Sequence, residues 1–366
     1  MKLFHIHSCI LQKLVSTSVL VYLLAGCTTL GPTAIRSGRL AYNNAIIETE
    51  NQQMLMVAIH NRYQERGNLL AVASVTANVR VRTSAGIQPG IGNENNYAGN
   101  LVPFSAGVFY EENPTISYTP VGGEKYMRQL FSPVPISILA QLTGTLSDPA
   151  PFYNSLVSSV NGIYNPDFYH AATEPDLRFS RLVAILASLT QAQRLHWLED
   201  PKQDGSFSIH IDRSRAGFET DITKLLALLG LKPPKDPSDA IIIPVTLALD
   251  RRSKGGIGIT TRSVWDLVEI LTASIEIPEK DQKNGITASY PPPGPVGKTL
   301  RVRRAEDRPK HASVAVKYRG GWFYIDEKNQ ATKQYFRLLG TMWSVTIAET
   351  SVNSSASPVL TVPVSR

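Results

Sequence analysis

The chain has 366 residues, of which 43% are hydrophobic and 18% are charged, and its formal net charge is +7. These values are typical of a globular protein and exclude a largely disordered chain, which buries too little apolar surface to fold. The length indicates one large domain or two closely packed domains. Both cysteines, Cys9 and Cys27, lie near the N-terminus, which excludes thiol catalysis and cysteine metal sites in the body of the protein.

The N-terminus reads as an export signal. Lys2 and Lys13 precede a short apolar stretch that ends in Leu24-Ala25-Gly26-Cys27. Such a stretch is too short to span a bilayer and is typical of a secretory signal peptide. Its last four residues resemble the bacterial lipobox, which implies a signal peptide at residues 1–26 and a lipid-modified, palmitate-carrying Cys27. An ordinary secretory signal and an uncleaved membrane anchor are the alternatives.

Residues 27–36 are expected to form a lipidated tether between the membrane and the folded body. Thr28 follows the cysteine, and by resemblance to the sorting rule of Gram-negative lipoproteins this favours the outer membrane, with the protein facing the periplasm. Each buried methylene of the acyl chains contributes about 0.8 kcal/mol, so the attachment would be nearly permanent. Loss of residues 1–26 removes two lysines and lowers the net charge from +7 to +5. An exported protein is not expected to bind nucleic acid.

The pattern of apolar residues predicts an α+β fold, a mostly antiparallel sheet with interspersed amphipathic helices. A proline-free helix is predicted from Ser37 to Arg66, and Val75, Ala77 and Val79 then alternate with polar residues, as in a strand. Further helices are predicted at residues 124–131, 176–195, 218–229, 263–275 and 329–347. Strands are predicted at residues 69–83, 107–120, 206–211, 240–249, 300–304 and 312–326, the last as a hairpin that turns at residues 319–321.

A proline-rich segment at residues 233–237 is the clearest candidate linker. It divides the chain into an N-terminal α+β domain at residues 37–232 and a C-terminal α+β module at residues 239–350. The polar residues 351–366 are expected to form an exposed tail. Ser263 with Asp266 has the spacing of a helix capping box.

Sites for metals, cofactors or nucleotides are not expected. Gly297-Lys298-Thr299 has the end of a phosphate-binding loop, but Pro292 stands where that motif needs glycine. His210 and Asp212 would share a strand face and His196 would lie near a helix end, yet a metal site needs a further partner at fixed geometry.

No hydrolase motif is present, which favours a protein that is not an enzyme. The alternative is a periplasmic hydrolase that acts on peptidoglycan or another glycan. Its carboxylates would have to converge from distant segments, for instance from Glu199, Asp200, Asp212 and Glu219.

Basic and aromatic residues concentrate near the C-terminus. The candidate contact residues for an envelope protein partner or for anionic headgroups are Arg301, Arg303, Arg304, Lys317, Arg319 and Trp322. An ordinary solvated surface is the alternative for the basic residues. The aromatic residues around Trp322 and Trp343 are expected to join the hairpin to the last helix as core, and any exposed remainder would be a docking surface.

Four short stretches resemble an uncharacterised family of Gram-negative lipoproteins. They are Arg39–Ile46 with Asn61-Arg62-Tyr63, then Thr261-Arg262-Ser263, and then Tyr318–Asp326. The resemblance implies a lipoprotein but no ligand, activity or site residue. With the lipobox, it leads to a membrane-anchored periplasmic lipoprotein, a non-enzymatic binding or scaffold component of a cell-envelope assembly.

Overall fold

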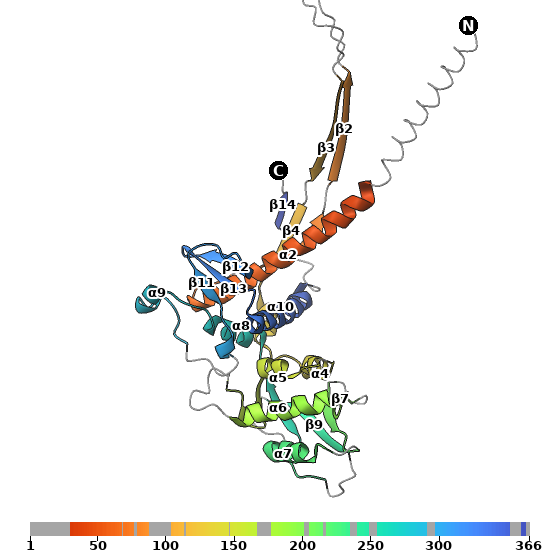
Figure 1. Ribbon diagram of the computed structural model, residues 1–366, viewed down its shortest axis with the longest axis vertical. Coiled ribbons are helices and arrows are strands. Elements are labelled where there is room, and N and C mark those ends of the chain that lie inside the picture. The colour runs from red at the N-terminus through yellow and green to blue at the C-terminus, as the bar shows by residue number, and fades with distance from the viewer. Residues whose placement is uncertain are drawn as a thin grey trace, which may run out of the picture. The chain divides into compact units, whose positions relative to one another are not determined.

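A computed structural model describes most of the body of the protein (Figure 1). The described residues are 30–67, 69–76, 79–87, 104–112, 115–145, 147–166, 177–200, 205–214, 217–234, 240–248, 255–290, 297–351 and 360–363. The predicted signal peptide and Cys27 lie outside them. None of the helices in this part of the chain is both long enough and apolar enough to cross a membrane.

The predicted α+β fold is confirmed, with helices interspersed among mostly antiparallel strands. The helices are α2 (Leu30–Arg62), α3 (Glu124–Phe131), α4 (Ile136–Thr145), α5 (Ala150–Leu156), α6 (Leu177–Gln191), α7 (Glu219–Leu229), α8 (Val264–Ala273), α9 (Glu279–Lys283), the 3-10 helix η2 (Gly297–Thr299) and α10 (Gln330–Ser351). The chain divides into two compact units, residues 1–52 and 53–366. Every strand that the structure describes belongs to the second unit.

Helix α2 begins at Leu30, whereas the sequence predicts a start near Ser37 and a tether up to residue 36. Pro32 does not oppose the earlier start, because a proline in the first helical turn removes a donor that has no partner there. The last turns of α2 belong to the second unit, where Leu55 and Ile59 are fully buried.

The largest sheet of the second unit, among the described residues, has six strands. Its order is β6-β5-β10-β9-β8-β7, and only the neighbours β9 and β10 run parallel. The strands are β5 (Val157–Val160), β6 (Ile163–Tyr164), β7 (Leu195–Glu199), β8 (Phe207–Ile211), β9 (Ile241–Leu247) and β10 (Ile257–Thr261). Strands from both sides of residues 233–237 therefore share one sheet. The predicted boundary there does not separate two folding units, because β9 hydrogen-bonds to β8 on one side and to β10 on the other.

The junction between β10 and α8 explains the Thr261-Arg262-Ser263 motif. Thr261 ends the strand, and Ser263 caps α8 in the predicted capping box with Asp266. The Arg262 side chain between them is fully buried, and its Nη1 donates to the carbonyl oxygens of Asn154 and Ser155, each at 2.9 Å. Those carbonyls belong to the last turn of α5, where a helix exposes acceptors and favours a cation.

A three-stranded antiparallel sheet of order β11-β13-β12 contributes buried side chains to the same core as α10. It consists of β11 (Arg303–Ala305), β12 (Ala312–Tyr318) and β13 (Gly321–Asp326). Phe323 and Ile325 are fully buried, and Trp343 of α10 is 5% exposed. The hairpin turns at Arg319-Gly320, and both residues have positive φ (44° and 75°), as in a type I′ turn.

The remaining strands are β1 (Leu69–Thr76), β2 (Val79–Ile87), β3 (Phe104–Glu112), β4 (Thr115–Val121) and β14 (Leu360–Pro363). They form a three-stranded sheet, β1-β4-β14, and a two-stranded sheet, β2-β3. The segment after Ser351 was expected to be an exposed tail, but β14 pairs with β4 from Tyr118 to Thr115. Leu360 and Val362 alternate with polar or turn residues, which is compatible with an edge strand.

Candidate partner-contact surface

The outer face of the β11-β13-β12 sheet gathers aromatic and basic residues. The register places Ala305, Trp322 and Lys317 in one row across the three strands. Arg303, Tyr324 and Ala315 form the next row. Because Phe323 and Ile325 are buried on the opposite face, these two rows make up the face turned away from the core. Trp322 and Tyr324 remain half-buried there, beside small alanines on the neighbouring strands.

A cation lies over one of the two aromatic rings, and others lie on the same face. The Arg308 guanidinium lies 5.4 Å from the centroid of the Trp322 ring, in cation–π contact. Lys317 and Arg308 are exposed, and neither forms an ion pair with another described residue. Arg303 pairs with Asp326, which lies 3.5 Å away on the same face. We call Arg303, Arg308, Lys317, Trp322 and Tyr324 the aromatic-basic face.

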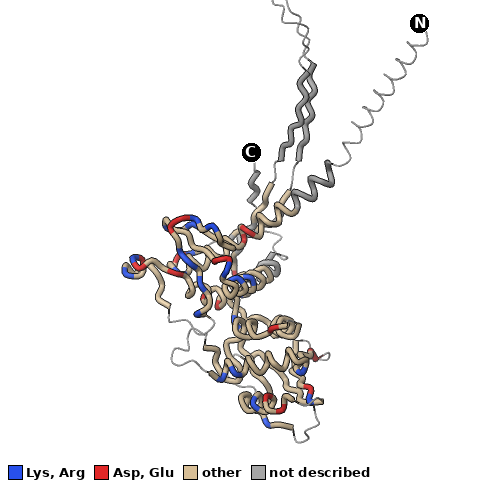
Figure 2. Tube along the Cα trace, in the orientation of Figure 1, with Lys and Arg blue, Asp and Glu red and all other residues tan. Residues whose placement is uncertain are grey.

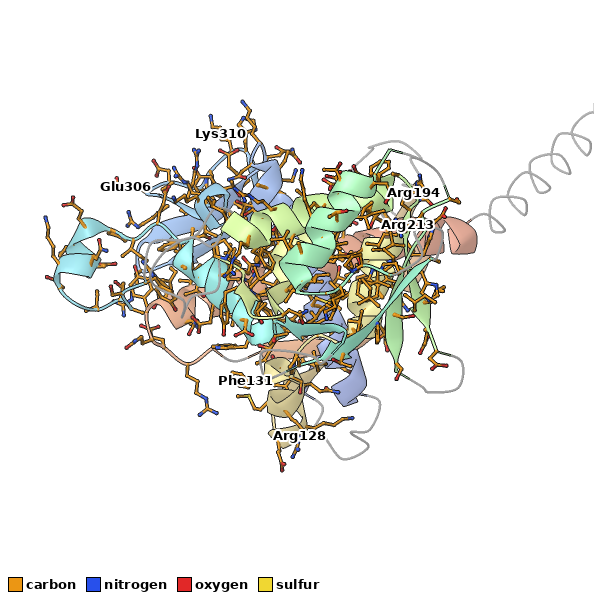
Figure 3. All side chains as sticks on the ribbon, turned by 90° about the horizontal axis from the view of Figure 1, so that it is seen from below. Arg128, Phe131, Arg194, Arg213, Glu306 and Lys310 are labelled. Carbon is orange, nitrogen blue, oxygen red and sulfur yellow. The ribbon has the colours of Figure 1, made fainter. Side chains whose placement is uncertain are left out.

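The charge around this face is mixed rather than uniformly positive. Figure 2 shows basic and acidic residues interleaved over the C-terminal strands. In the loop between β11 and β12, Glu306 and Lys310 reach out in Figure 3, and both are exposed. Any contact made at this face therefore depends on the positions of individual cations and not on a uniformly positive electrostatic potential.

Three of the six residues predicted from the sequence as contact residues lie elsewhere. Arg301 precedes β11 and lies 4.0 Å from Glu276. Arg304 belongs to the inner-face row of Phe323, and its guanidinium lies where a Cβ on Gly321 would come within 2.8 Å of it. Arg319 sits in the turn and is bound to Glu65 at 2.6 Å. Arg303, Lys317 and Trp322 are the three that the fold brings together.

The turn that carries Arg319 is attached to the chain just after α2. Glu65 accepts hydrogen bonds from the Tyr318 hydroxyl and from Arg319, both at 2.6 Å. These two donors lower the pKa of Glu65, because they stabilise its charged form. The Arg319 guanidinium also lies 4.8 Å from the centroid of the Tyr63 ring. Together these contacts, which we call the α2 latch, hold the hairpin that presents the aromatic-basic face.

The Asn61-Arg62-Tyr63 motif ties the same region to other elements. Asn61 donates to Glu269 of α8 at 2.9 Å, and the Tyr63 hydroxyl donates to Asp281 of α9 at 2.7 Å. Burial and this bond raise the pKa of Tyr63. Asn61–Tyr63 and Tyr318–Asp326 are two of the stretches that resemble the lipoprotein family, and they are separated by 255 or more residues in the sequence. They contact each other in the structure through the rings of Tyr63 and Tyr318.

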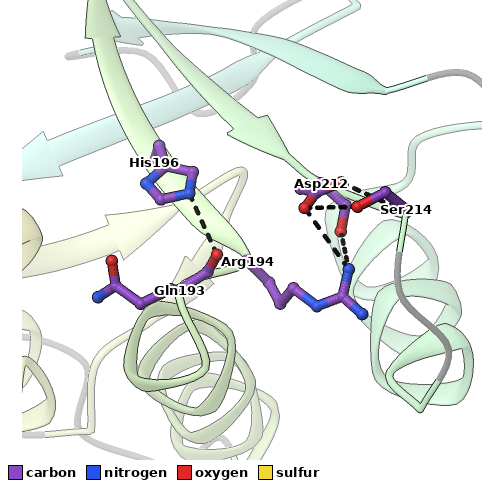
Figure 4. Close-up of polar contacts among 5 residues, drawn as sticks. All are labelled: Gln193, Arg194, His196, Asp212 and Ser214. Carbon is purple, nitrogen blue, oxygen red and sulfur yellow. Dashed lines mark hydrogen bonds and ion pairs between the residues drawn. The ribbon is translucent and has the colours of Figure 1, made fainter.

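His196 lies on the edge strand β7 of the six-stranded sheet, and Asp212 directly follows the neighbouring strand β8 (Figure 4). His196 was expected near a helix end, but it lies in β7, directly opposite His210 of β8. Helix α6 ends at Gln191, and Gln193 has a positive φ of 55°, so a turn separates the helix from β7. His196 Nε2 lies 3.2 Å from the Gln193 carbonyl oxygen.

Two of the four carboxylates named for the alternative hydrolase, Asp212 and Glu219, pair with other groups. Asp212 accepts from the backbone N–H and the hydroxyl of Ser214, and its Oδ2 lies 3.7 Å from Arg194. Glu219 lies 3.0 Å from Arg213. These contacts stabilise the connection between β8 and α7.

No set of three or more metal-ligating side chains gathers within the described part of the chain. Gly297-Lys298-Thr299 forms a three-residue 3-10 helix, η2, and not the start of the long helix that a phosphate-binding loop requires.

We compared the chain with family models, with curated proteins and with solved structures, and none of the three comparisons finds a match. The site therefore stands on its geometry alone. Tyr324 lies two residues after Trp322 in the same strand, so the sequence pattern places both on one face. Arg308 was not among the candidate contact residues predicted from the sequence, because its position over Trp322 depends on the path of a loop.

Proposed function

We propose that this protein is a membrane-anchored periplasmic lipoprotein that acts without catalysis, as a binding or scaffold component of an envelope assembly. The observation that carries the proposal is the aromatic-basic face. Half-buried tryptophan and tyrosine rings that share one face with three cations suit an anionic surface, where the rings lie at the level of headgroups and the cations bind phosphate.

The lipobox supports the location. A lipid on Cys27 would keep the folded body within reach of the outer membrane, so a modest affinity for anionic headgroups would be enough to orient it. Labelling with a fatty-acid analogue tests the anchor. Cys27→Ser should abolish both the labelling and the processed form, and unchanged labelling and processing would contradict the anchor.

The contact itself is tested with an unlipidated soluble form and anionic vesicles. Each basic residue near such a surface contributes about 1 kcal/mol, so three together contribute about 3 kcal/mol, or about a hundredfold in affinity. Sedimentation with the vesicles should weaken with added salt. Arg303→Glu/Arg308→Glu/Lys317→Glu should lose it.

The control variant is Arg181→Glu/Lys224→Glu/Lys232→Glu. Arg181 is exposed on α6, Lys224 is exposed on α7, and Lys232 is exposed just after α7. The three substitutions change the net charge by the same amount as those on the aromatic-basic face. The control should bind as the parent does. If both folded variants lose binding equally, net charge alone is responsible for the binding. If both folded variants bind as the parent does, the aromatic-basic face is not the contact.

A further inference from the structure

The sheet of order β11-β13-β12 has one edge that is closed within the chain. Residues 274–276 run beside the start of β11. The backbone N–H of Val302 donates to the Ser274 carbonyl oxygen at 3.1 Å, and the Val302 carbonyl accepts from the Glu276 N–H at 2.9 Å. The Arg304 N–H donates to a carboxylate oxygen of Glu276 at 3.3 Å. Another strand therefore has little to bind on this side of the sheet.

The opposite edge, formed by β12, is open. Tyr318 and Gly321 flank the two-residue turn, so they form a hydrogen-bonded pair, and bonded and non-bonded pairs then alternate along the hairpin. Lys317 and Ala315 fall in the non-bonded pairs, where the N–H and C=O groups point away from β13. No described residue forms a hydrogen bond with these outward groups. We call the outer side of β12 from Val314 to Tyr318 the open edge.

The open edge is regular and accessible. β12 has 7 residues, and its one irregularity, a register shift between Ala312 and Val314, lies before the open edge begins. Lys317 is exposed and Ala315 is half-buried on the outer face, whereas Val316 on the inner face is 7% exposed. A strand edge with unpaired backbone groups is a template for pairing with another chain.

The charges near the open edge have one sign. Residues 308–325 include two arginines, two lysines and a histidine, and they include no aspartate or glutamate. Lys317, in the middle of the open edge, forms no ion pair with another described residue. Opposite charges on neighbouring strands stabilise pairing and like charges oppose it. A second copy of β12 would bring two basic strands together, whereas a strand with a carboxylate beside Lys317 is complementary.

We propose that the open edge binds an extended, acidic segment of a partner protein, which adds to the sheet as a fourth strand. The backbone of the segment exchanges hydrogen bonds with Ala315 and Lys317. A carboxylate of the segment lies beside Lys317 on the outer face. Because successive side chains point to opposite faces, the next residue lies beside Val316 and is apolar. The recognised pattern is therefore an alternation of acidic and apolar residues.

This inference deepens the proposed scaffold function and rests on it for the presence of a protein partner in the envelope. It does not require the contact with headgroups, because that contact uses the outer face of the sheet and the added strand uses its rim. Lys317 belongs to both surfaces. The decisive substitution is therefore placed at Ala315, which is not part of the aromatic-basic face.

Binding is measured by fluorescence anisotropy with the full chain in a neutral detergent. The probe is a labelled peptide, Val-Glu-Val-Glu-Val-Glu-Val, and its control has lysine in place of each glutamate. The glutamate peptide should bind about tenfold more tightly than the lysine peptide, through one gained attraction and one avoided repulsion. Equal binding of the two peptides, or no binding of either, would overturn the proposal.

Hydrogen–deuterium exchange at single-residue resolution locates the peptide. The amides of Ala315 and Lys317 should exchange more slowly when the glutamate peptide is bound. The amide of Val316 should change less, because it already pairs with β13. Slower exchange confined to any other segment would show that the peptide does not bind at the open edge.

Ala315→Pro removes one outward donor without removing a bond to β13, which is the position where an edge strand tolerates proline. It should weaken binding of the glutamate peptide by about tenfold, the effect of a lost backbone hydrogen bond. Ala315→Ser keeps the N–H and is the matched control, which should bind as the parent does. Equal affinity of the folded Ala315→Pro protein and the parent would contradict strand addition.

Lys317→Glu provides a test that does not depend on the folding of the proline variant. It should reverse the preference, so that the lysine peptide binds more tightly than the glutamate peptide. A preference for the glutamate peptide that persists in this variant would overturn the assigned role of Lys317.

Vesicle binding separates this proposal from the contact with headgroups. Ala315→Pro retains the cations of the aromatic-basic face and should sediment with anionic vesicles as the parent does. A parent that binds the peptide but not the vesicles would contradict the headgroup contact alone, and the reverse result would contradict the open edge alone. A dimer of the parent that Ala315→Pro abolishes would identify a second copy as the occupant and overturn the acidic partner.

Discussion

Arg262 is the largest of the side chains that the described structure buries completely. It links three elements, since it follows β10, precedes the cap of α8 and donates to the C-terminal carbonyls of α5. An apolar residue of similar size would fill the space but leave the Ser155 carbonyl without this donor. The carbonyl groups at the C-terminus of α5 thus compensate for the burial of the Arg262 charge.

We expect Arg262→Met to lower the free energy of unfolding by about 3 kcal/mol, the contribution of two hydrogen bonds from a charged donor. Arg303→Met, at an exposed position, should change it by less than about 0.5 kcal/mol. Denaturant midpoints of the two variants measure the difference. A stable Arg262→Met protein would show that α5 needs no cation at its end.

Glu65 gives the α2 latch a pH dependence. Its pKa is lowered in the folded protein by Tyr318 and Arg319, so the stabilisation is complete above the unfolded value near 4.5 and is lost as the pH falls through the folded pKa. Glu65→Gln should therefore be less stable than the parent at pH 7, and this difference should shrink as the pH falls and the carboxylate of the parent takes up a proton. The difference is small because the pair is partly exposed. Thermal unfolding of both proteins at pH 7 and over a series of lower pH values checks the sign.

The turn of the β12–β13 hairpin determines which side chains lie opposite each other on the aromatic-basic face. Two residues connect the strands, which keeps Trp322 opposite Lys317 and fixes the aromatic-basic face. Gly320 has a φ of +75° and open space around the place of a Cβ. Any effect of alanine there comes from the backbone and not from a clash.

Gly320→Ala should destabilise the protein by about 1–2 kcal/mol, the penalty of a left-handed conformation for a residue with a Cβ. Gly122→Ala is the control, because Gly122 also has open space around it but no positive φ. Its stability should stay close to that of the parent. Chemical denaturation of both variants compares them directly, and equal stabilities would contradict a strained turn.

Elements with strong local signals could be predicted, and those set by distant contacts could not. The capping box at Ser263 and the hairpin at Arg319 follow from neighbouring residues, so spacing alone was sufficient. His196 was wrongly expected near a helix end because Leu195 continues the helical spacing of α6. The alternation of Leu195 with Trp197 was the competing signal for β7. The partner of Arg319 is Glu65, 254 residues earlier in the chain, a pairing that no local pattern contains.

The arrangement of the second unit follows from its sheets rather than from the composition of its linkers. Prolines at residues 233, 234 and 237 suggested a boundary, but β9 after them is flanked by β8 and β10. Ile241, Ile243 and Val245 are buried on one face of β9. These residues have no core to join unless both flanking strands are present.

The chain should therefore unfold as one body beyond residue 52. Residues 53–232 expressed alone lack β9 and β10, so β8 and β5 would lose their central neighbours and expose buried side chains such as Ile209 and Val160. We expect this fragment to lack a cooperative thermal transition, whereas residues 53–366 should show a single one. Circular dichroism and calorimetry of the two fragments distinguish the alternatives. A cooperative transition in residues 53–232 would restore the proline-rich segment as a domain boundary, and the six-stranded sheet would then be a contact between two domains.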